Sequence, residues 1–186
     1  MSSENLSGAV NQQERPTHSS WLDRIPLDLG HYVAGFVDGE GSFNVPIRRE
    51  RDRMMPLRAG LSFNVSQIGR SHPELLQEVY ACGTVRERKD SVVYFEVTRP
   101  SDLVERVFPF FERFPLRGPK AVDLSVFIEI THLVQSGEHL SPAGLRKIVE
   151  LRSPMNRGGK RRRTDEQIGQ LLEEWESSEA IRKAPQ

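Results

Sequence analysis

The sequence predicts an α+β fold in which an antiparallel sheet carries helices on one face. Residues 61–67 alternate strictly between apolar and polar side chains, which is typical of a half-buried strand. A second alternating stretch covers residues 42–48, and residues 84–99 fit a hairpin with its turn at 89–91. Helical segments separate these strand pairs. The expected order is therefore αββαββα, which favours an α+β domain.

The first expected helix begins near Leu29 and ends at the glycines of residues 39–41. Asp28 is well placed to cap this helix, because its carboxylate can accept hydrogen bonds from the free N–H groups of the first turn. Residues 1–20 are polar and show no periodicity, so we expect a disordered arm there. The domain itself is expected to cover residues 21–159.

The strand at residues 42–48 turns its apolar side chains to one face and contains Pro46. A proline cannot donate a ladder hydrogen bond, so Pro46 is expected at an edge or a bulge. Residues 48–58 contain five arginines and are too polar to pack, which predicts a hairpin loop. The strand at residues 61–67 follows, with leucine, phenylalanine and valine pointing inward and serine and asparagine pointing outward.

The remaining elements are mostly helices with recognisable first turns. Proline is favoured at the first helical position and serine at the cap before it. These signals place helices at residues 72–82, 101–114, 119–135 and 141–151, with Ser101 and Ser141 as caps. Residues 160–186 combine a basic run with an acidic C-terminal helix and tail. No internal repeat is present, and the length suits one domain.

Charge is distributed unevenly along the chain, although its formal net charge is zero. Residues 1–30 carry a net charge of −2 and residues 164–186 a net charge of −4, which leaves +6 for residues 31–163. Such asymmetry is a better indicator of a nucleic-acid surface than total charge. The central domain is therefore a candidate nucleic-acid-binding domain.

Several classes of protein are not expected. A single cysteine, Cys82, excludes an internal disulfide, and it lies in an apolar helical run where a packed thiol is expected. No apolar stretch is long enough to span a membrane, and the N-terminus does not look like a secretory signal, so an intracellular protein is expected, in a cytoplasm with its nucleoid or in an organelle matrix. The five histidines share no metal-ligand spacing, which argues against zinc.

Residues 33–41 place Gly35 and Gly39 one helical turn apart and put a carboxylate, Glu40, where the helix ends. A glycine within a helix costs about 1 kcal/mol relative to alanine, and close approach of a second helix would offset that cost. Two helices packed in this way would bring two copies of Glu40 together. Paired carboxylates suit divalent metal ions and phosphodiester chemistry. An incidental acid is disfavoured there, because it meets the negative end of the helix dipole.

The same segment, VAGFVDGEG, resembles the signature nonapeptide of the LAGLIDADG homing endonucleases. Residues 108–130 and 139–158 resemble segments that follow the signature in that family, in the same order and at similar distances. The resemblance covers residues 29–159, about 70% of the chain. It implies the family's αββαββα domain with a saddle-shaped antiparallel sheet.

The resemblance also implies a site and an assembly. Each Glu40 of a pair would hold Mg²⁺ against one scissile phosphate, and the backbone carbonyl of Gly39 would complete the ligands. One motif per chain implies a homodimer, with an interface formed by Ala34, Gly35, Asp38 and Gly39. For Asp38, a helix-terminal residue that bonds backbone or lysine is the alternative to a catalytic role.

Three further residues are candidates near this centre. Gln67 ends its strand where the family's sheet meets the catalytic pocket, so it would position water, unless it is a simple surface residue. Lys120 resembles a basic residue that would stabilise charge at the phosphate. An ordinary first-turn lysine is the alternative, and the loop at Glu138 and His139 sometimes supplies this group in the family. Arg70 is a candidate phosphate contact.

The polar residues of the expected sheet are candidates for DNA reading. Arginine pairs with guanine and asparagine with adenine in the major groove, although polar rows on a sheet are often only solvated. A ten-residue strand spans roughly 33 Å, about one turn of duplex, so two protomers would cover about two turns. The basic run after Gly159 is expected to clamp phosphates. The candidate DNA-binding residues are Asn44, Arg48, Ser62, Asn64, Ser66, Arg70, Arg86, Arg88, Lys160, Arg161, Arg162 and Arg163.

Together with the resemblance, these observations predict a site-specific, Mg²⁺-dependent homing endonuclease that cleaves both strands of double-stranded DNA. We expect it to be encoded by an intron. It would act as a homodimer on a long pseudo-palindromic site. Two functions of the same fold remain as alternatives: a maturase that assists the splicing of intron RNA, and a DNA-binding regulator that does not cleave. An unrelated α+β interaction domain is the last alternative.

Overall fold

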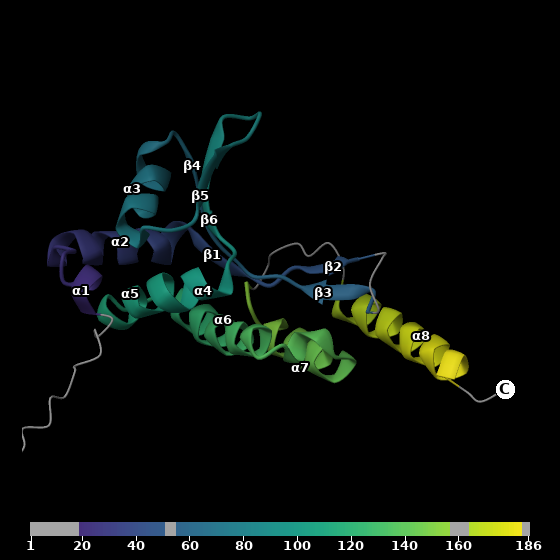
Figure 1. Ribbon diagram of the computed structural model, residues 1–186. Helices are drawn as coiled ribbons and strands as arrows, with labels where there is room; N and C mark the ends of the chain where they lie inside the picture. Colours follow the sequence, from purple (N-terminus) through teal and green to yellow (C-terminus); the bar gives the residue numbers. More distant parts are fainter. Residues whose placement is uncertain (1–18, 51–54, 157–163, 184–186) are drawn as a thin grey trace, which may run out of the picture.

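The computed structural model describes residues 19–50, 55–156 and 164–183 (Figure 1). The expected arm at residues 1–20 lies almost wholly outside these ranges, as does the basic run at residues 160–163. The helices are α1 Ser19–Leu22, α2 Leu27–Glu40, α3 Ser71–Tyr80, α4 Pro100–Asp102, the π-helix η1 Leu103–Val107, α5 Phe108–Arg113, α6 Lys120–Gln135, the 3₁₀ turn η2 Glu138–Leu140, α7 Pro142–Arg152 and α8 Asp165–Lys183. The strands are β1 Gly41–Asn44, β2 Ile47–Arg49, β3 Leu57–Ala59, β4 Ser62–Ile68, β5 Thr84–Glu87 and β6 Val92–Val97.

Four strands form one antiparallel sheet in the order β1-β4-β6-β5, and β2 pairs with β3 in a separate two-stranded ribbon. Figure 1 shows α5 and α6 beneath the strands, with the β2–β3 ribbon extending to the right towards α8. The expected α+β class and αββαββα order are confirmed. Among the described residues, no helix is long and apolar enough to cross a bilayer.

The core lies between the inner face of the sheet and the helices. Its centre is a set of stacked and edge-on rings from β1, β4, β6, α3 and α5, including Phe43, Phe63, Phe95, Tyr80 and Phe111, all at most 4% exposed. Burial of each large apolar side chain contributes about 1.5–3 kcal/mol, so this cluster fixes the sheet against the helices. The outer face of the sheet carries no covering helix in the described part of the chain.

The expected strand at residues 42–48 is divided. β1 ends at Asn44, and the chain restarts as β2 at Ile47. Pro46 lies between them and lacks an N–H, while its carbonyl accepts a hydrogen bond from Gly60 N–H at 2.9 Å. The β2–β3 ribbon therefore continues the β1–β4 pair with a break at this proline.

Two expected helix caps are wrong. The first helix begins two residues earlier than expected, with Pro26 at the cap position and Asp28 inside the first turn, where the carboxylate still suits the helix dipole. Arg99, not Ser101, precedes the next helical run, and Pro100 takes its first position. The expected cap at Ser141 is confirmed, because its hydroxyl accepts a hydrogen bond from Gly144 N–H at 3.1 Å.

The run from α4 through η1 to α5 is one helical stretch with a π-helical segment in the middle. Pro109 follows this segment, and a proline removes one helical hydrogen bond and crowds the carbonyl four residues before it. A wider π turn relieves that crowding. Cys82 lies next to this stretch and is half-buried. Burial and the Asp102 carboxylate raise the pKa of its thiol to about 12, which disfavours the thiolate form.

Candidate catalytic centre and nucleic-acid interface

Glu40 is the last residue of α2 and lies at an exposed tip. The helix can turn straight into β1 because Gly41 is extended (φ −73°, ψ 162°) while its N–H still donates to the Val37 carbonyl. A Cβ at Gly41 would lie 2.6 Å from that carbonyl oxygen, so only glycine fits this junction. In the described part of the chain no hydrogen bond or ion pair holds Glu40. Its carboxylate is therefore available to an external ligand.

One face of α2 is open. Val33 and Val37 pack into the core on one side, whereas Leu27, His31, Gly35 and Gly39 form an exposed row along the helix. A Cβ at Gly35 or Gly39 would meet no described atom within 4 Å. Contacts within the described subunit therefore give no reason for glycine at these two positions.

A hollow of about 340 Å³ lies beside this row, lined in part by Gly35, Asp38 and Arg117. Ala34, which was also expected at the subunit interface, lines the hollow too but is only 4% exposed. It therefore belongs mainly to the core of its own subunit. Gly35 and Gly39 are the expected interface residues that the structure leaves open.

Asp38 anchors the loop that leads into α6. Its Oδ2 accepts hydrogen bonds from the backbone N–H groups of Arg117 (2.9 Å) and Gly118 (2.6 Å). A Cβ at Gly118 would lie 2.8 Å from Oδ1, so the loop approaches the carboxylate closely only because residue 118 is glycine. The structure thus agrees with the backbone-bonding alternative for Asp38.

That anchor brings Lys120 to the C-terminal end of α2. Lys120 is the first residue of α6, two positions after the loop that Asp38 holds. The other candidate loop, with Glu138 and His139, follows the far end of this 16-residue helix, which is about 24 Å long. Lys120 is therefore the basic candidate that shares an end of α6 with the α2 contact.

Gln67 approaches the same end of α2 from the sheet. Gly41, which follows Glu40, pairs with Val65, and Gln67 lies two residues further along β4, opposite Val93. By alternation, Gln67 shares the inner face of the sheet with Val65. Three different elements thus bring Glu40, Gln67 and Lys120 to one end of α2.

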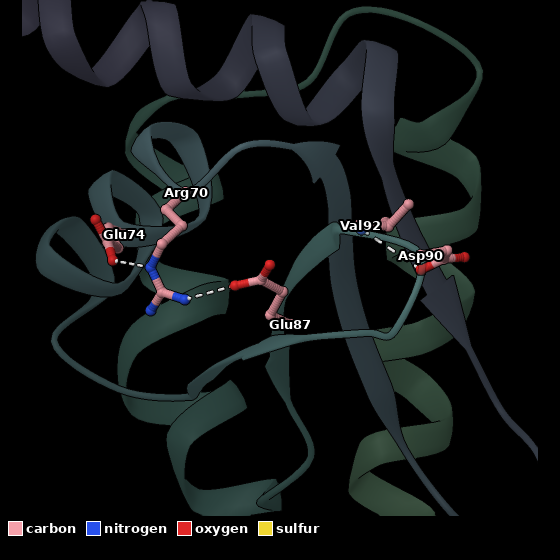
Figure 2. Close-up of polar contacts among 5 residues, drawn as sticks. All are labelled: Arg70, Glu74, Glu87, Asp90 and Val92. Carbon is pink, nitrogen blue, oxygen red and sulfur yellow. Dashed lines mark hydrogen bonds and ion pairs between the residues drawn. The ribbon is translucent and has the colours of Figure 1, made fainter.

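Arg70 is exposed just before α3 and is paired with two carboxylates (Figure 2). Its Nε lies 2.7 Å from Glu74, and its Nη1 lies 3.4 Å from Glu87 on β5. These partners, Glu74 foremost, raise the pKa of the guanidinium. A phosphate would have to compete with both acids. The same figure shows Asp90 turning the β5–β6 hairpin, where its Oδ1 accepts from Val92 N–H at 3.4 Å.

The expected polar residues of the sheet share its outer face. The register places Asn44 opposite Ser62, Ser42 opposite Asn64, and Ser66 in line with Tyr94 and Arg86. Arg88 continues the same face, since its N–H donates to Val92 O. Some of these side chains bond one another: Asn44 Nδ2 donates to Ser42 Oγ at 2.9 Å. The face is therefore polar throughout, but Ser62 is only 7% exposed and Asn44 Oδ1 already accepts a hydrogen bond from Asn156 Nδ2 at 3.3 Å.

Sequence reasoning missed four residues of this surface. Ser42, Thr84, Tyr94 and Glu96 occupy outward positions by the same register. For two of them the sequence pattern was present, because Tyr94 and Glu96 alternate in β6 with Val93, Phe95 and Val97, which are buried. The alternation in residues 92–97 would have found Tyr94 and Glu96.

The β2–β3 ribbon presents two arginines side by side. Arg48 pairs directly opposite Arg58, and both are exposed. Like charges in such a pair destabilise a sheet. Arg58 Nη1 lies 3.7 Å from Glu50 Oε1, whereas no ion pair within the described residues holds Arg48, which an external anion could therefore bind. The ribbon is braced from behind by Arg152, which is 5% exposed and donates to Val45 O (2.8 Å) and Asp165 Oδ1 (2.6 Å).

Comparisons with known proteins identify the family and the fold. The family model described as "LAGLIDADG endonuclease" matches residues 33–131, which is more than half of the chain. The chain is 32% identical over 139 residues to "Probable intron-encoded endonuclease 2" of Neurospora crassa; this match covers 72% of the chain but only 29% of that relative.

Solved structures of homing endonucleases are similar to this chain in fold. The homing endonuclease I-TnaI is 34% identical with a TM-score of 0.68, over 78% of this chain and 97% of that one. I-SmaMI, bound to an uncleaved DNA target in the presence of calcium ions, is 30% identical with a TM-score of 0.64, over 68% of this chain and 44% of that one. The extent of the family match and the shared fold show that this chain belongs to the LAGLIDADG endonuclease family.

Proposed function

We propose that this protein is a site-specific, metal-dependent DNA endonuclease that acts as a homodimer on a long pseudo-palindromic site. The observation that carries the proposal is Glu40: an exposed carboxylate at the tip of a helix whose outer face is open. That tip lies at one end of an uncovered polar sheet. The chain spans 29% of its curated Neurospora crassa relative, so the activity of that protein supports the proposal without deciding it.

The homodimer is supported by the row Leu27, His31, Gly35 and Gly39. An exposed helix face without side chains at two positions accepts the backbone of a second helix at short range. A two-fold contact places the same face on both subunits and carries both copies of Glu40 to one end. The chain covers nearly all of I-TnaI but less than half of I-SmaMI, as expected of one unit that pairs with a second.

Double-stranded DNA fits the outer sheet surface and the ribbon. Asparagine and arginine side chains of Asn44, Asn64 and Arg86 suit the base edges of the major groove. The paired Arg48 and Arg58 suit the phosphates further along. Arg70 would exchange one of its carboxylate partners for a phosphate, and Lys160 to Arg163 would add backbone contacts. A DNA substrate places the activity in a compartment that holds DNA, a cytoplasm with its nucleoid or an organelle matrix.

The site fits a hard divalent ion such as Mg²⁺. Among the described residues, no three His, Cys, Asp or Glu side chains cluster. The described residues therefore do not surround a metal ion with protein ligands alone. A phosphate of the DNA would supply part of the coordination, as is usual for magnesium. Glu40 and the Gly39 carbonyl are the oxygen ligands that one subunit offers. The ion would stabilise charge on the attacked phosphate and on the leaving 3′ oxygen.

The protein's own groups then have separate roles. Gln67 would orient the attacking water, and Lys120 would stabilise the negative charge that develops on the phosphate. Attack in line with the leaving group leaves a 3′ hydroxyl on one fragment and a 5′ phosphate on the other. Two copies of the site, one per subunit, would cut the two strands.

A plasmid assay tests this proposal. The substrate is supercoiled DNA that carries the intron-less form of the gene's own insertion locus. We expect linear product with Mg²⁺, and binding without cleavage with Ca²⁺, whose looser coordination positions the phosphate less strictly. Glu129→Gln, an exposed acid on α6, is the control and should cut like the wild type.

The alternatives give different results in that assay. A non-cleaving regulator binds the locus and never cuts it with any divalent ion. A maturase binds the folded intron RNA more tightly than the locus DNA. Either result would contradict the proposed endonuclease activity.

A further inference from the structure

Glu96 is an acid in the middle of the outer sheet surface. It lies on β6, a central strand, opposite Asn64 on β4 and Thr84 on β5. Its neighbours Phe95 and Val97 are fully buried on the inner face, so the Glu96 side chain belongs to the outer one. A carboxylate at this place faces whatever the sheet binds.

Hydrogen bonds hold the Glu96 carboxylate in place, but none of them comes from a positively charged side chain. The Ser62 hydroxyl donates to Glu96 Oε1 at 2.8 Å, and Asn64 Nδ2 donates in turn to Ser62 Oγ at 3.0 Å. Among the described residues, no lysine or arginine pairs with Glu96, whereas Glu74 and Glu87 both pair with Arg70. A carboxylate has room for about four hydrogen bonds, so Glu96 keeps acceptor capacity for a ligand.

The chemistry of the major groove narrows what that ligand is. A carboxylate repels phosphates and only accepts hydrogen bonds, so it needs a donor on a base edge. The groove offers two donors, the N4 amino group of cytosine and the N6 amino group of adenine. Adenine N6 stands beside N7, an acceptor that would face the second carboxylate oxygen. Adenine N6 also has thymine O4 on its other side, whereas cytosine N4 has an acceptor, guanine O6, on one side only and the C5–H group on the other, so cytosine is the better partner.

We propose that Glu96 determines sequence specificity by accepting a hydrogen bond from a cytosine amino group, once in each half-site. This inference rests on the DNA-binding function proposed above. The Ser62–Asn64 chain orients the carboxylate, and its negative charge penalises sequences that present no donor at this place.

The test is a binding selection on DNA with a randomised target site. The wild type should prefer cytosine at one position of each half-site by about 5- to 150-fold over the other bases. Glu96→Gln keeps an acceptor for the Ser62 hydroxyl but replaces one oxygen with an amide nitrogen, which suits adenine. The preference at that position should move to adenine, with the other positions unchanged. Glu96→Ala should leave the position without preference.

Glu87→Gln is the matched control, because Glu87 belongs to the same hairpin but to the inner face by register. It should not change the preferred base at any position. Identical base preferences for wild type, Glu96→Gln and Glu96→Ala would overturn the role of Glu96. A wild type that binds no DNA at all would instead overturn the proposed function, so the two failures are distinguishable.

Discussion

Gly35→Leu should separate the two subunits while leaving each one folded. A side chain at residue 35 meets no described atom of its own subunit within 4 Å, so leucine creates no clash there. It also removes a helix-interior glycine, which should stabilise the isolated subunit by up to about 1 kcal/mol. The perturbation therefore acts on the assembly and not on the fold.

The size of the effect follows from packing. Extra carbon atoms in a close contact cost about 1–3 kcal/mol for each side chain, and a two-fold interface receives two of them. The sum of about 2–6 kcal/mol raises the dimer dissociation constant by roughly 30-fold to 20,000-fold. At micromolar concentrations that change converts a tight dimer into monomers.

Sedimentation equilibrium of wild type and variant measures this directly, with urea unfolding to confirm that the variant is folded. Gly169→Leu is the matched control, because Gly169 on α8 is also a helical glycine with no described atom near its Cβ position. It should remain dimeric. A Gly35→Leu protein that dimerises as tightly as the wild type, or a wild type that is monomeric and still cuts both strands, would refute the reasoning.

Three further predictions concern stability and binding. Arg152→Met should lower the free energy of unfolding in urea by about 3 kcal/mol, because it leaves Asp165 and the Val45 carbonyl without this buried partner. An unchanged urea midpoint would show that Arg152 does not stabilise the ribbon. Burial, with Arg58 nearby, lowers the pKa of His139 below its ordinary 6.5, so the folded state favours the neutral ring. His139 therefore contributes to the free energy of unfolding above pH 6.5, and this contribution is lost as the pH falls below 6.5. The decrease in the free energy of unfolding over this pH range should be smaller in His139→Asn. Replacing all four residues 160–163 with alanine should weaken binding to specific and random DNA alike. The slope of log K against log salt concentration should fall by up to about 0.9 per lost phosphate contact, and an unchanged slope would show that these residues do not bind phosphates.

Local patterns in the sequence predicted most of the fold. Alternation located β4, the turn at residues 89–91 located the β5–β6 hairpin, and serine followed by proline located the start of α7. The misplaced caps at Asp28 and Ser101 have a common cause, since each time a nearby proline takes the start of the helix and displaces the polar residue into the first turn. The π-helical segment also follows from a proline, because Pro109 crowds the carbonyl four residues before it.

The contacts that assemble the candidate site are long-range and left no local signal. Asp38 bonds the backbone 79 and 80 residues away, and Arg152 reaches Val45 across 107 residues. Residue 118 is glycine because a Cβ there would lie 2.8 Å from Asp38 Oδ1, a contact that the sequence alone does not reveal. The sequence could suggest Glu40 and Lys120 separately, but their common position at the end of α2 follows from these contacts.

Glu40→Gln tests the central claim most directly. The substitution removes a charged metal ligand from an exposed tip and disturbs no hydrogen bond among the described residues, so folding, dimerisation and DNA binding should stay as in the wild type. Cleavage of the plasmid with Mg²⁺ should be abolished, for both strands, while the exposed-acid control Glu129→Gln remains active. If Glu40→Gln nicks or linearises the plasmid at the wild-type rate, Glu40 is not the metal-binding acid and the proposed catalytic centre is wrong.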